Sequence, residues 1–550
     1  MKMPETKEKP RGSHDIPAAI LNRRWILPVG VAFLGLALNT IVAVKMAITP
    51  DEPDHVGYGI AVLKGHPERG SGVVYNSKMP VSVLNGLPRA IGRLLRVSGL
   101  TERLGERLSG LRAARFPTIF AAFGLCLLVY FYAESLYGRK AALFAEVLFV
   151  LSPNIMAHST LGTVDLYSAL AVVLFLYSFR VFLLQPSLKT ALYSALVLGA
   201  AQLTKFSAIY LYFVLVLFAL SVLTYSRFTQ NSPFRITRRQ LGLAAALFVL
   251  CPVAIINVGY LFNRTFTPLA LYEFSSTSFK TLQQVPILRA IPLPLPYPYV
   301  QGFDLMSYAN SHGVTFGNIC LLGQVRGPEL ARSDGFYAYY LVAYLFKEPL
   351  GLQLLFLLSL IWIARHRRLA DLLRAEWLLL LTAGTFLFML SFFSKTQIGI
   401  RHILPVLTIF VIVSGAAFAN WCQYRWRYRA LLWGCLLWIA VSVGSYFPHM
   451  IPYFNEILTD RRTAYKILAD SNLDWDQDDW VVDDFLKKNP DVLLNPSAPV
   501  AGRILVRGDL LAGVAPEKAD YWVRQKGLEP IAQVGYAHFL FDVPKSELPH

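Results

Sequence analysis

Runs of about 20 apolar residues recur along this chain, and they limit what it can fold into more than any other feature. A helix of about 20 residues crosses the hydrocarbon core of a bilayer. Because 55% of the 550 residues are hydrophobic and only 16% are charged, one water-soluble core cannot cover this much apolar surface. The sequence therefore predicts an all-α polytopic membrane protein. About eleven spans are expected, over residues 25–49, 114–133, 141–157, 162–184, 190–204, 206–224, 241–262, 337–363, 377–393, 402–420 and 430–448.

Lys and Arg between the runs predict the side that each connecting loop occupies. Loops rich in these residues favour the cytoplasmic side, which makes residues 1–24 a cytoplasmic tail. Residues 25–448 then form the transmembrane domain, with large outer loops at 50–113 and 263–336. Residues 449–550 fall outside as a C-terminal domain. The net charge of +17 lies largely in these short loops, where it sets topology and meets anionic lipid, so no nucleic-acid partner is expected.

The C-terminal segment has a different pattern from the rest of the chain. "RILVRG" and "IAQVGYAHFLFDV" predict strands, and "DQDDWVVDDFLKKN" predicts an amphipathic helix. A small soluble α/β domain is therefore expected. In "SNLDWDQDDW", Asp474, Asp476 and Asp478 alternate as in a calcium loop, but the glycine and distal glutamate of such a loop are missing. A structural or acceptor-facing role is expected instead.

Acidic residues gather directly after the first apolar run, in "AITPDEPDHVGYG" (residues 47–59). Asp51 or Glu52 could cap a helix, because acidic side chains and proline both favour a first helical turn. Alternatively, a carboxylate beside low-dielectric surroundings binds a proton more tightly, which suits a general base. Asp51 and His55 share one helical face, a spacing that permits two metal ligands. The residues alone leave capping and catalysis both open.

Several motifs occur in an order and on a predicted side that resemble a known class. The Asp-Glu pair after the first span and the Tyr-x-x-Lys-x-Pro element are similar to those of GT-C glycosyltransferases that use polyprenyl-phosphate sugars. Protein O-mannosyltransferases and lipid A aminoarabinose transferases belong to this class. Ser77 stands where the latter usually have an acidic residue. The motifs are "YNSKMPVSVLNGLP" (75–88), "AHSTLGTVDLYSALAVVLF" (157–175), "YAYYLVAYLFKEPLGL" (337–352), "SKTQIGIRHILPVL" (394–407) and "AYKILADSNLDWDQD" (464–478).

The resemblance implies an enzyme at the outer face of the bacterial cytoplasmic (inner) membrane. It would transfer a sugar from a polyprenyl-phosphate-linked donor to a hydroxyl of a glycan, lipid or protein acceptor, with inversion. Asp51 would be the general base, with Glu52 as its helper, and cations would stabilise the leaving phosphate. A divalent metal ion is a candidate cofactor, with Asp51, His55 and Asp165 as candidate ligands. The candidate substrate-binding residues are Tyr75, Lys78, Asp165, Lys347, Lys395, Arg401 and His402.

Other interpretations stay open for the same residues. Each lysine could extend to a lipid headgroup, Asp165 could cap a helix, and Lys347 could pair with the adjacent Glu348. Many spans with a few charges also describe a transporter or a flippase for lipid-linked sugars. Transporters tend to show repeat symmetry and charges at the membrane midplane, whereas the candidate residues here cluster at one predicted face. The enzyme is therefore favoured over the transporter.

Overall fold

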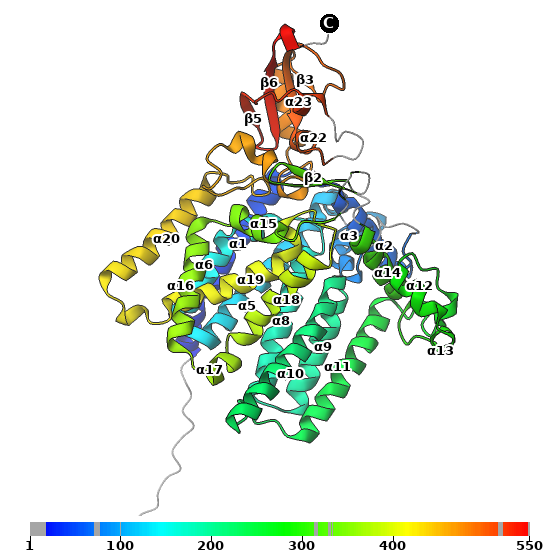
Figure 1. Cartoon of the computed structure of the whole chain (residues 1–550), viewed down its shortest axis with the longest axis vertical. Helices are drawn as coiled ribbons and strands as arrows, with labels where there is room; N and C mark the ends of the chain where they lie inside the picture. The colour runs from blue at the N-terminus through cyan, green and yellow to red at the C-terminus, as the bar shows by residue number, and fades with distance from the viewer. Residues whose placement is uncertain are drawn as a thin grey trace, which may run out of the picture.

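The protein is a bundle of apolar helices with two small sheets at one end, as Figure 1 shows. It is seen here as a computed structural model that describes residues 18–70, 77–98, 101–312, 317–327, 330, 332, 334–514 and 521–547. The predicted fold class is confirmed. The bundle consists of α1 (Ala18–Lys45), α5 (Phe116–Tyr137), α6 (Arg139–Leu151), α8 (Asp165–Leu184), α9 (Leu188–Gln202), α10 (Tyr210–Thr229), α11 (Arg238–Gly259), α15 (Tyr339–Lys347), α16 (Leu350–His366), α18 (Trp377–Phe392), α19 (Leu404–Ser414) and α20 (Trp426–Gly444).

Local sequence signals set where several of these helices begin and end. At α9, the Ser187 hydroxyl accepts the Thr190 N–H at 3.2 Å, and the Thr190 hydroxyl accepts the Ser187 N–H at 3.1 Å. Thr237 and Gln240 form the same reciprocal cap at α11. Such caps satisfy N–H groups that have no partner within the helix. Gly138, with φ +83°, makes the turn between α5 and α6 that a side chain would disfavour.

The expected number of about eleven spans stays a prediction. Among the described residues, six helices are long and apolar enough to cross a membrane. A seventh span arises if α15 and α16, which meet at a bend of 113°, are counted together. α6 and α9 have 13 and 15 residues, and at about 1.5 Å per residue they are shorter than the hydrocarbon thickness. The apolar runs thus predicted where helices form, and the number of complete crossings stays open to experiment.

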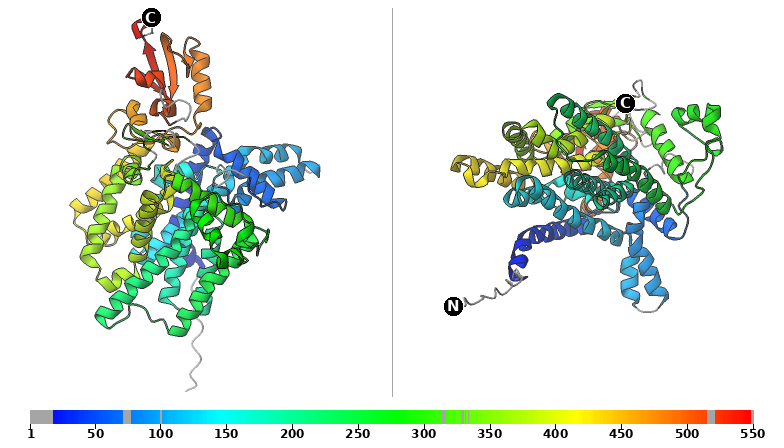
Figure 2. Two further views of the ribbon diagram at one scale, coloured as in Figure 1. Left: turned by 45° about the vertical axis from the view of Figure 1, so that its right-hand side comes forward. Right: turned by 90° about the horizontal axis from the view of Figure 1, so that it is seen from below.

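The two large connecting loops and the tail lie at the same end of the bundle (Figure 1). The N-terminal end of α1 lies at the opposite end, where Arg24 pairs with Glu134 of α5 at 2.8 Å. Figure 2 shows α3 and α4 projecting sideways as a helical pair. These loops contain α2 (Asp51–Leu63), α3 (Val83–Val97), α4 (Glu102–Ser109), α12 (Thr277–Gln284), α13 (Pro286–Arg289), α14 (Tyr297–His312), β1 (Ile319–Leu321) and β2 (Gln324–Arg326).

The tail forms the predicted strands and helix. Its sheet has the order β3-β4-β6-β5, with β3 parallel to β4 and the other pairs antiparallel. Leu505 packs with Val482 of the covering helix, whereas Ile504 and Phe541, on the other face, join the core of the bundle. The sheet is therefore docked on the membrane helices through a buried apolar face. Its elements are α21 (Asp479–Lys488), β3 (Leu493–Leu494), β4 (Gly502–Arg507), α22 (Gly508–Ala512), β5 (Ala532–Val534) and β6 (His538–Val543).

Candidate active site

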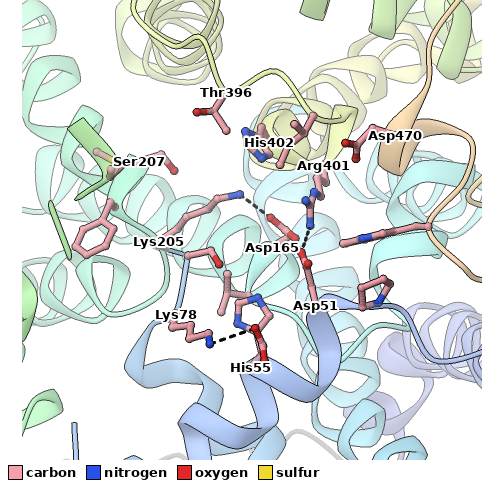
Figure 3. A pocket seen from close by; sticks show the side chains of 18 of the residues that line it. Asp51, His55, Lys78, Asp165, Lys205, Ser207, Thr396, Arg401, His402 and Asp470 are labelled. Carbon is pink, nitrogen blue, oxygen red and sulfur yellow. Dashed lines mark hydrogen bonds and ion pairs between the residues drawn. The ribbon is translucent and has the colours of Figure 1, made fainter. Parts of the chain in front are cut away.

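A cavity of about 280 Å³ lies where the bundle, the outer loops and the tail meet (Figure 3). Its walls come from α2, the start of α8, the turn before α10, the turn before α19, and the tail. Helix starts from distant parts of the chain thus converge on one space. The charged residues and histidines that line it are Asp51, Asp54, His55, Lys78, Asp165, Lys205, Arg401, His402, Asp470, Asp474, Asp476, Arg507 and Asp509.

The first turn of α2 directs its acidic residues to two different sides. Asp51, Asp54 and His55 line the cavity, because residues three and four apart share a helical face. His55 is buried, and its Nδ1 lies 3.5 Å from the hydroxyl of Ser82. Burial lowers the pKa of His55 below its usual value, so that the ring is neutral. This face of α2 therefore presents two carboxylates and a neutral imidazole to the cavity.

Glu52 points away from the cavity and does not line it. Its carboxylate accepts two bonds from Arg115, at 2.6 and 2.8 Å, and both side chains are 1% exposed. It also accepts the backbone N–H groups of Thr49 at 3.0 Å and Gly162 at 2.9 Å. Glu52 thus satisfies the backbone before α2 and fastens this helix to the bundle. The sequence left open whether Asp51 or Glu52 caps the helix, and Glu52 is the residue with this structural role. Its position does not fit the expected role as a helper of the catalytic base.

Among the described residues outside the tail, three ion pairs line the cavity, as the dashed lines of Figure 3 indicate. Arg401 Nη1 lies 2.7 Å from Asp51 Oδ2. Lys205 Nζ lies 2.6 Å from Asp165 Oδ1, and Lys78 Nζ lies 3.2 Å from Asp54 Oδ2. Each pair joins a cation and a carboxylate from different segments. These pairs therefore give the cavity three cations that a phosphate could attract away from their carboxylates.

Arg401 is held on two sides. Its guanidinium lies 4.1 Å from the ring centroid of Trp475, a cation–π contact, and its side chain is 9% exposed. Arg401 and His402 belong to a short turn, η6 (Ile400–Ile403), before α19. His402 also lines the cavity, with its Nδ1 3.4 Å from the hydroxyl of Tyr340. The "RHILP" run therefore places its cation and its imidazole in the same space as Asp51.

The tail adds carboxylates to the far wall of the cavity. Arg507 Nε lies 3.0 Å from Asp474 Oδ2, and Arg507 also pairs with Asp476. Asp509 Oδ1 accepts the backbone N–H of Asp470 at 2.8 Å. Burial raises the pKa of Asp470 to about 6, and burial together with nearby carboxylates raises that of Asp509 well above its usual range. A protonated carboxyl group can donate a hydrogen bond, so this wall can both donate and accept.

Three other predicted substrate-binding residues lie elsewhere. Lys347 is fully buried, and its ammonium donates to the carbonyl oxygens of Ile451 and Asn472. Lys395 lies 3.7 Å from Asp334 and does not line the cavity. Neither position offers a contact with a ligand in the cavity, because the charge of Lys347 is enclosed and that of Lys395 is directed elsewhere. Tyr75 lies outside the described residues.

Sequence reasoning missed Lys205 and the contribution of Arg507 and Asp509. Lys205 stands alone between two apolar runs in "QLTKFSAIY", and a charge at such a junction is costly unless it meets a partner. The sequence therefore contained an indication that Lys205 has a specific partner. Arg507 ends the predicted strand "RILVRG" and Asp509 follows it. The segment has no distinctive motif, and only the docking of the tail brings these residues to the cavity.

The candidate metal ligands do not gather around one point. Asp51 pairs with Arg401 and Asp165 with Lys205. Within the described ranges, no group of three or more His, Cys, Asp or Glu side chains is placed to hold a metal ion. The residues present therefore do not provide a set of ligands for the divalent ion considered from the sequence.

Comparison with known proteins supports the expected class. Residues 103–256 match the model of the family described as dolichyl-phosphate-mannose-protein mannosyltransferase. The match extends from α4 through most of α11 and includes Asp165 and Lys205. It confirms the resemblance to membrane glycosyltransferases that use polyprenyl-phosphate-linked donors. A sequence search of curated proteins gave no match.

Solved structures with a similar course of the chain include two kinds of protein. ArnT from Cupriavidus metallidurans, bound to undecaprenyl phosphate, is 12% identical with a TM-score of 0.45, over 97% of this chain and 100% of that one. The oligosaccharyltransferase of Archaeoglobus fulgidus in the apo form is 12% identical with a TM-score of 0.48, over 76% of this chain and 55% of that one. Likeness at this level assigns no residue a role.

Proposed function

We propose that this protein is a glycosyltransferase that moves a sugar from a polyprenyl-phosphate-linked donor to an acceptor hydroxyl. The observation that carries the proposal is the pairing of Asp51 with Arg401 in a cavity that also holds Lys78 and Lys205. A base and several cations within one space are what such a transfer requires. The family match over residues 103–256 supports this class of donor. The place of the reaction would be the outer face of the bacterial cytoplasmic membrane.

In the proposed reaction, Asp51 acts as the general base. The acceptor oxygen attacks the anomeric carbon, its proton passes to the Asp51 carboxylate, and the bond from that carbon to the phosphate oxygen breaks. The electron pair leaves with polyprenyl phosphate, and attack opposite the leaving group inverts the anomeric centre. Asp51 suits this role because its side chain is 37% exposed and reaches the cavity.

The cations would stabilise the phosphate as it leaves. Arg401 and Lys205 come from turns that begin α19 and α10, and Lys78 precedes the short helix before α3. When a donor enters, its phosphate would compete with the carboxylates for these cations, since charge-assisted bonds to phosphate are strong. The competition would free Asp51 from Arg401 at the moment when a base is needed.

The proposal is tested by lipid analysis of cells that lack the protein. Mass spectrometry of their polyprenyl-phosphate sugars should show one species accumulating, and the wild-type gene should remove it. The Asp51→Asn variant should leave the accumulation unchanged although the protein is folded and inserted. Glu134→Gln, the same change at the opposite end of the bundle, should behave as the wild type.

Two results would contradict the proposal. Normal removal of the accumulated species by Asp51→Asn would exclude Asp51 as the base. Movement of a lipid-linked sugar across proteoliposome membranes, with no transfer to any acceptor, would instead favour a flippase.

A further inference from the structure

A short loop of the tail is fastened to the turn that carries Arg401. The carboxamide oxygen of Asn472 accepts the N–H of Ile400 at 2.9 Å, and the hydroxyl of Ser471 donates to the carbonyl oxygen of Ile398. Three residues further on, Trp475 lies against the Arg401 guanidinium. The loop 470–475 therefore fixes both the backbone and the side chain of the turn on which Arg401 sits.

Lys347 also binds this loop. Its ammonium donates to the carbonyl oxygen of Asn472 at 2.5 Å and to that of Ile451 at 2.7 Å. The same ammonium lies 4.6 Å from the centroid of the Phe454 ring. Lys347 is fully buried and touches no part of the cavity. A buried ammonium is costly unless it is satisfied, and the groups that satisfy it here belong to the tail.

The position of Lys347 in the chain explains how it reaches the tail. It is the last residue of α15, where the bent helix pair turns by 113° into α16. The carbonyl oxygens freed by the bend are met by side chains: Asn154 donates to that of Lys347 at 2.5 Å, and Gln353 to that of Glu348 at 2.9 Å. The bend is thus a rigid support from which the ammonium projects toward Asn472.

We propose that Lys347 is a positioning residue, which holds the tail loop 470–475 on the turn 400–403 and thereby fixes Arg401 between Asp51 and Trp475. The inference rests on the proposed function for its catalytic consequence, but the contacts themselves do not. A displacement of about 1 Å of a group that binds the reacting phosphate lowers the rate by about 100-fold. Loss of the Lys347 contacts should therefore reduce transfer although this residue touches no substrate.

Hydrogen exchange of the full-length protein in detergent tests the positioning without any substrate. In Lys347→Met, which keeps the length of the side chain but removes the donors, exchange should rise selectively at residues 400–403 and 470–475. Gln353→Leu is the matched control, because it weakens the same bend without touching the tail loop. It should leave exchange at both segments unchanged.

A second variant keeps the test decisive if Lys347→Met does not fold. Ser471→Ala removes the bond to Ile398 and leaves Lys347 in place, so it should raise exchange at the same two segments to a smaller extent. A uniform rise in exchange over the whole bundle, or equal effects of Lys347→Met and Gln353→Leu, would overturn the inference.

Kinetics then separate this inference from the proposed function. Once the donor is known, kcat/KM of Lys347→Met should fall by about 10- to 100-fold, and that of Gln353→Leu should stay near the wild-type value. Selective exchange without any transferase activity in the wild type would sink the function and leave the positioning intact. Full activity together with selective exchange would show that Arg401 needs no such support.

Discussion

The buried pair of Glu52 and Arg115 gives a sharp test of whether Glu52 is structural or catalytic. We expect Glu52→Gln to destabilise the protein. The two carboxylate oxygens face different sets of donors: one meets Thr49 and Arg115 Nη2, and the other meets Arg115 Nε and the Gly162 N–H. An amide has only one acceptor oxygen, so in either orientation its NH₂ group would face two of these donors. The guanidinium would also lose its neutralising charge.

The size of the effect follows from the burial of the pair. Both side chains are 1% exposed, and removing one partner of such a pair costs about 3–5 kcal/mol. Arg115 keeps bonds to the carbonyl oxygens of Ala43, Met46 and Ala47, so the expected loss is about 3 kcal/mol, at the lower end of this range. For a chain of this size the unfolding temperature should fall by about 3 °C.

Thermal unfolding in detergent checks this prediction. Transfer is measured in parallel, at a temperature where both the wild type and the variant are folded. Asp51→Asn serves as the matched control, since its side chain is 37% exposed and its loss should change the unfolding temperature by less than about 1 °C. The double variant Glu52→Gln with Arg115→Met should recover part of the stability, because both charges are then gone. An unchanged unfolding temperature with transfer abolished would refute the structural role and restore Glu52 as a catalytic residue.

Three further predictions concern the cavity. Lys205→Met should weaken binding of a polyprenyl phosphate by about 10- to 100-fold, because a charge-assisted bond contributes about 1.5–3 kcal/mol, and Lys205→Arg should keep most of it; equal binding by all three proteins would contradict this. Trp475→Leu should weaken the same binding by about 5-fold through loss of the contact with Arg401, as a titration in nanodiscs would show. Asp470, whose pKa is raised from 3.8 to about 6, contributes stability that is present below pH 3.8 and is lost as the pH rises through 6, by up to about 3 kcal/mol. The unfolding temperature of the wild type should therefore fall more between pH 4 and 7 than that of Asp470→Asn, and parallel curves would refute it.

The sequence determines some parts of this site and leaves others undetermined, for physical reasons. Asp51 could be singled out because it is an acidic residue directly after an apolar run, and Lys78 and Arg401 because their motifs resemble those of a known class of enzymes. Lys347 is also a charged residue in an apolar stretch, but a buried charge can either bind a ligand or stabilise the fold. Only the position of the tail, which depends on packing of its sheet against the bundle, decides between the two.

The distinction between Asp51 and Glu52 likewise depends on packing. Both are acidic residues in the first turn of α2, and nothing in their local sequence separates a cap from a base. Arg115 makes the difference, because it lies 63 residues further along the chain and is brought against Glu52 by the contact between α1 and α5. Helix periodicity then places Asp51 on another side, toward the cavity.

The pairing of Asp51 with Arg401 leads to a last prediction, which concerns affinity in the absence of turnover. If the phosphate of the lipid competes with Asp51 for the guanidinium, Asp51→Asn should bind a polyprenyl phosphate more tightly while it loses transfer. The pair is partly exposed, with side chains 37% and 9% accessible, so its rupture costs about 1 kcal/mol and the gain should be about fivefold. A titration of purified protein in nanodiscs measures it, with Arg401→Gln losing affinity in parallel. Weaker binding by Asp51→Asn would mean that the carboxylate supports the phosphate site. The proposal that donor binding releases Asp51 from Arg401 would then be wrong.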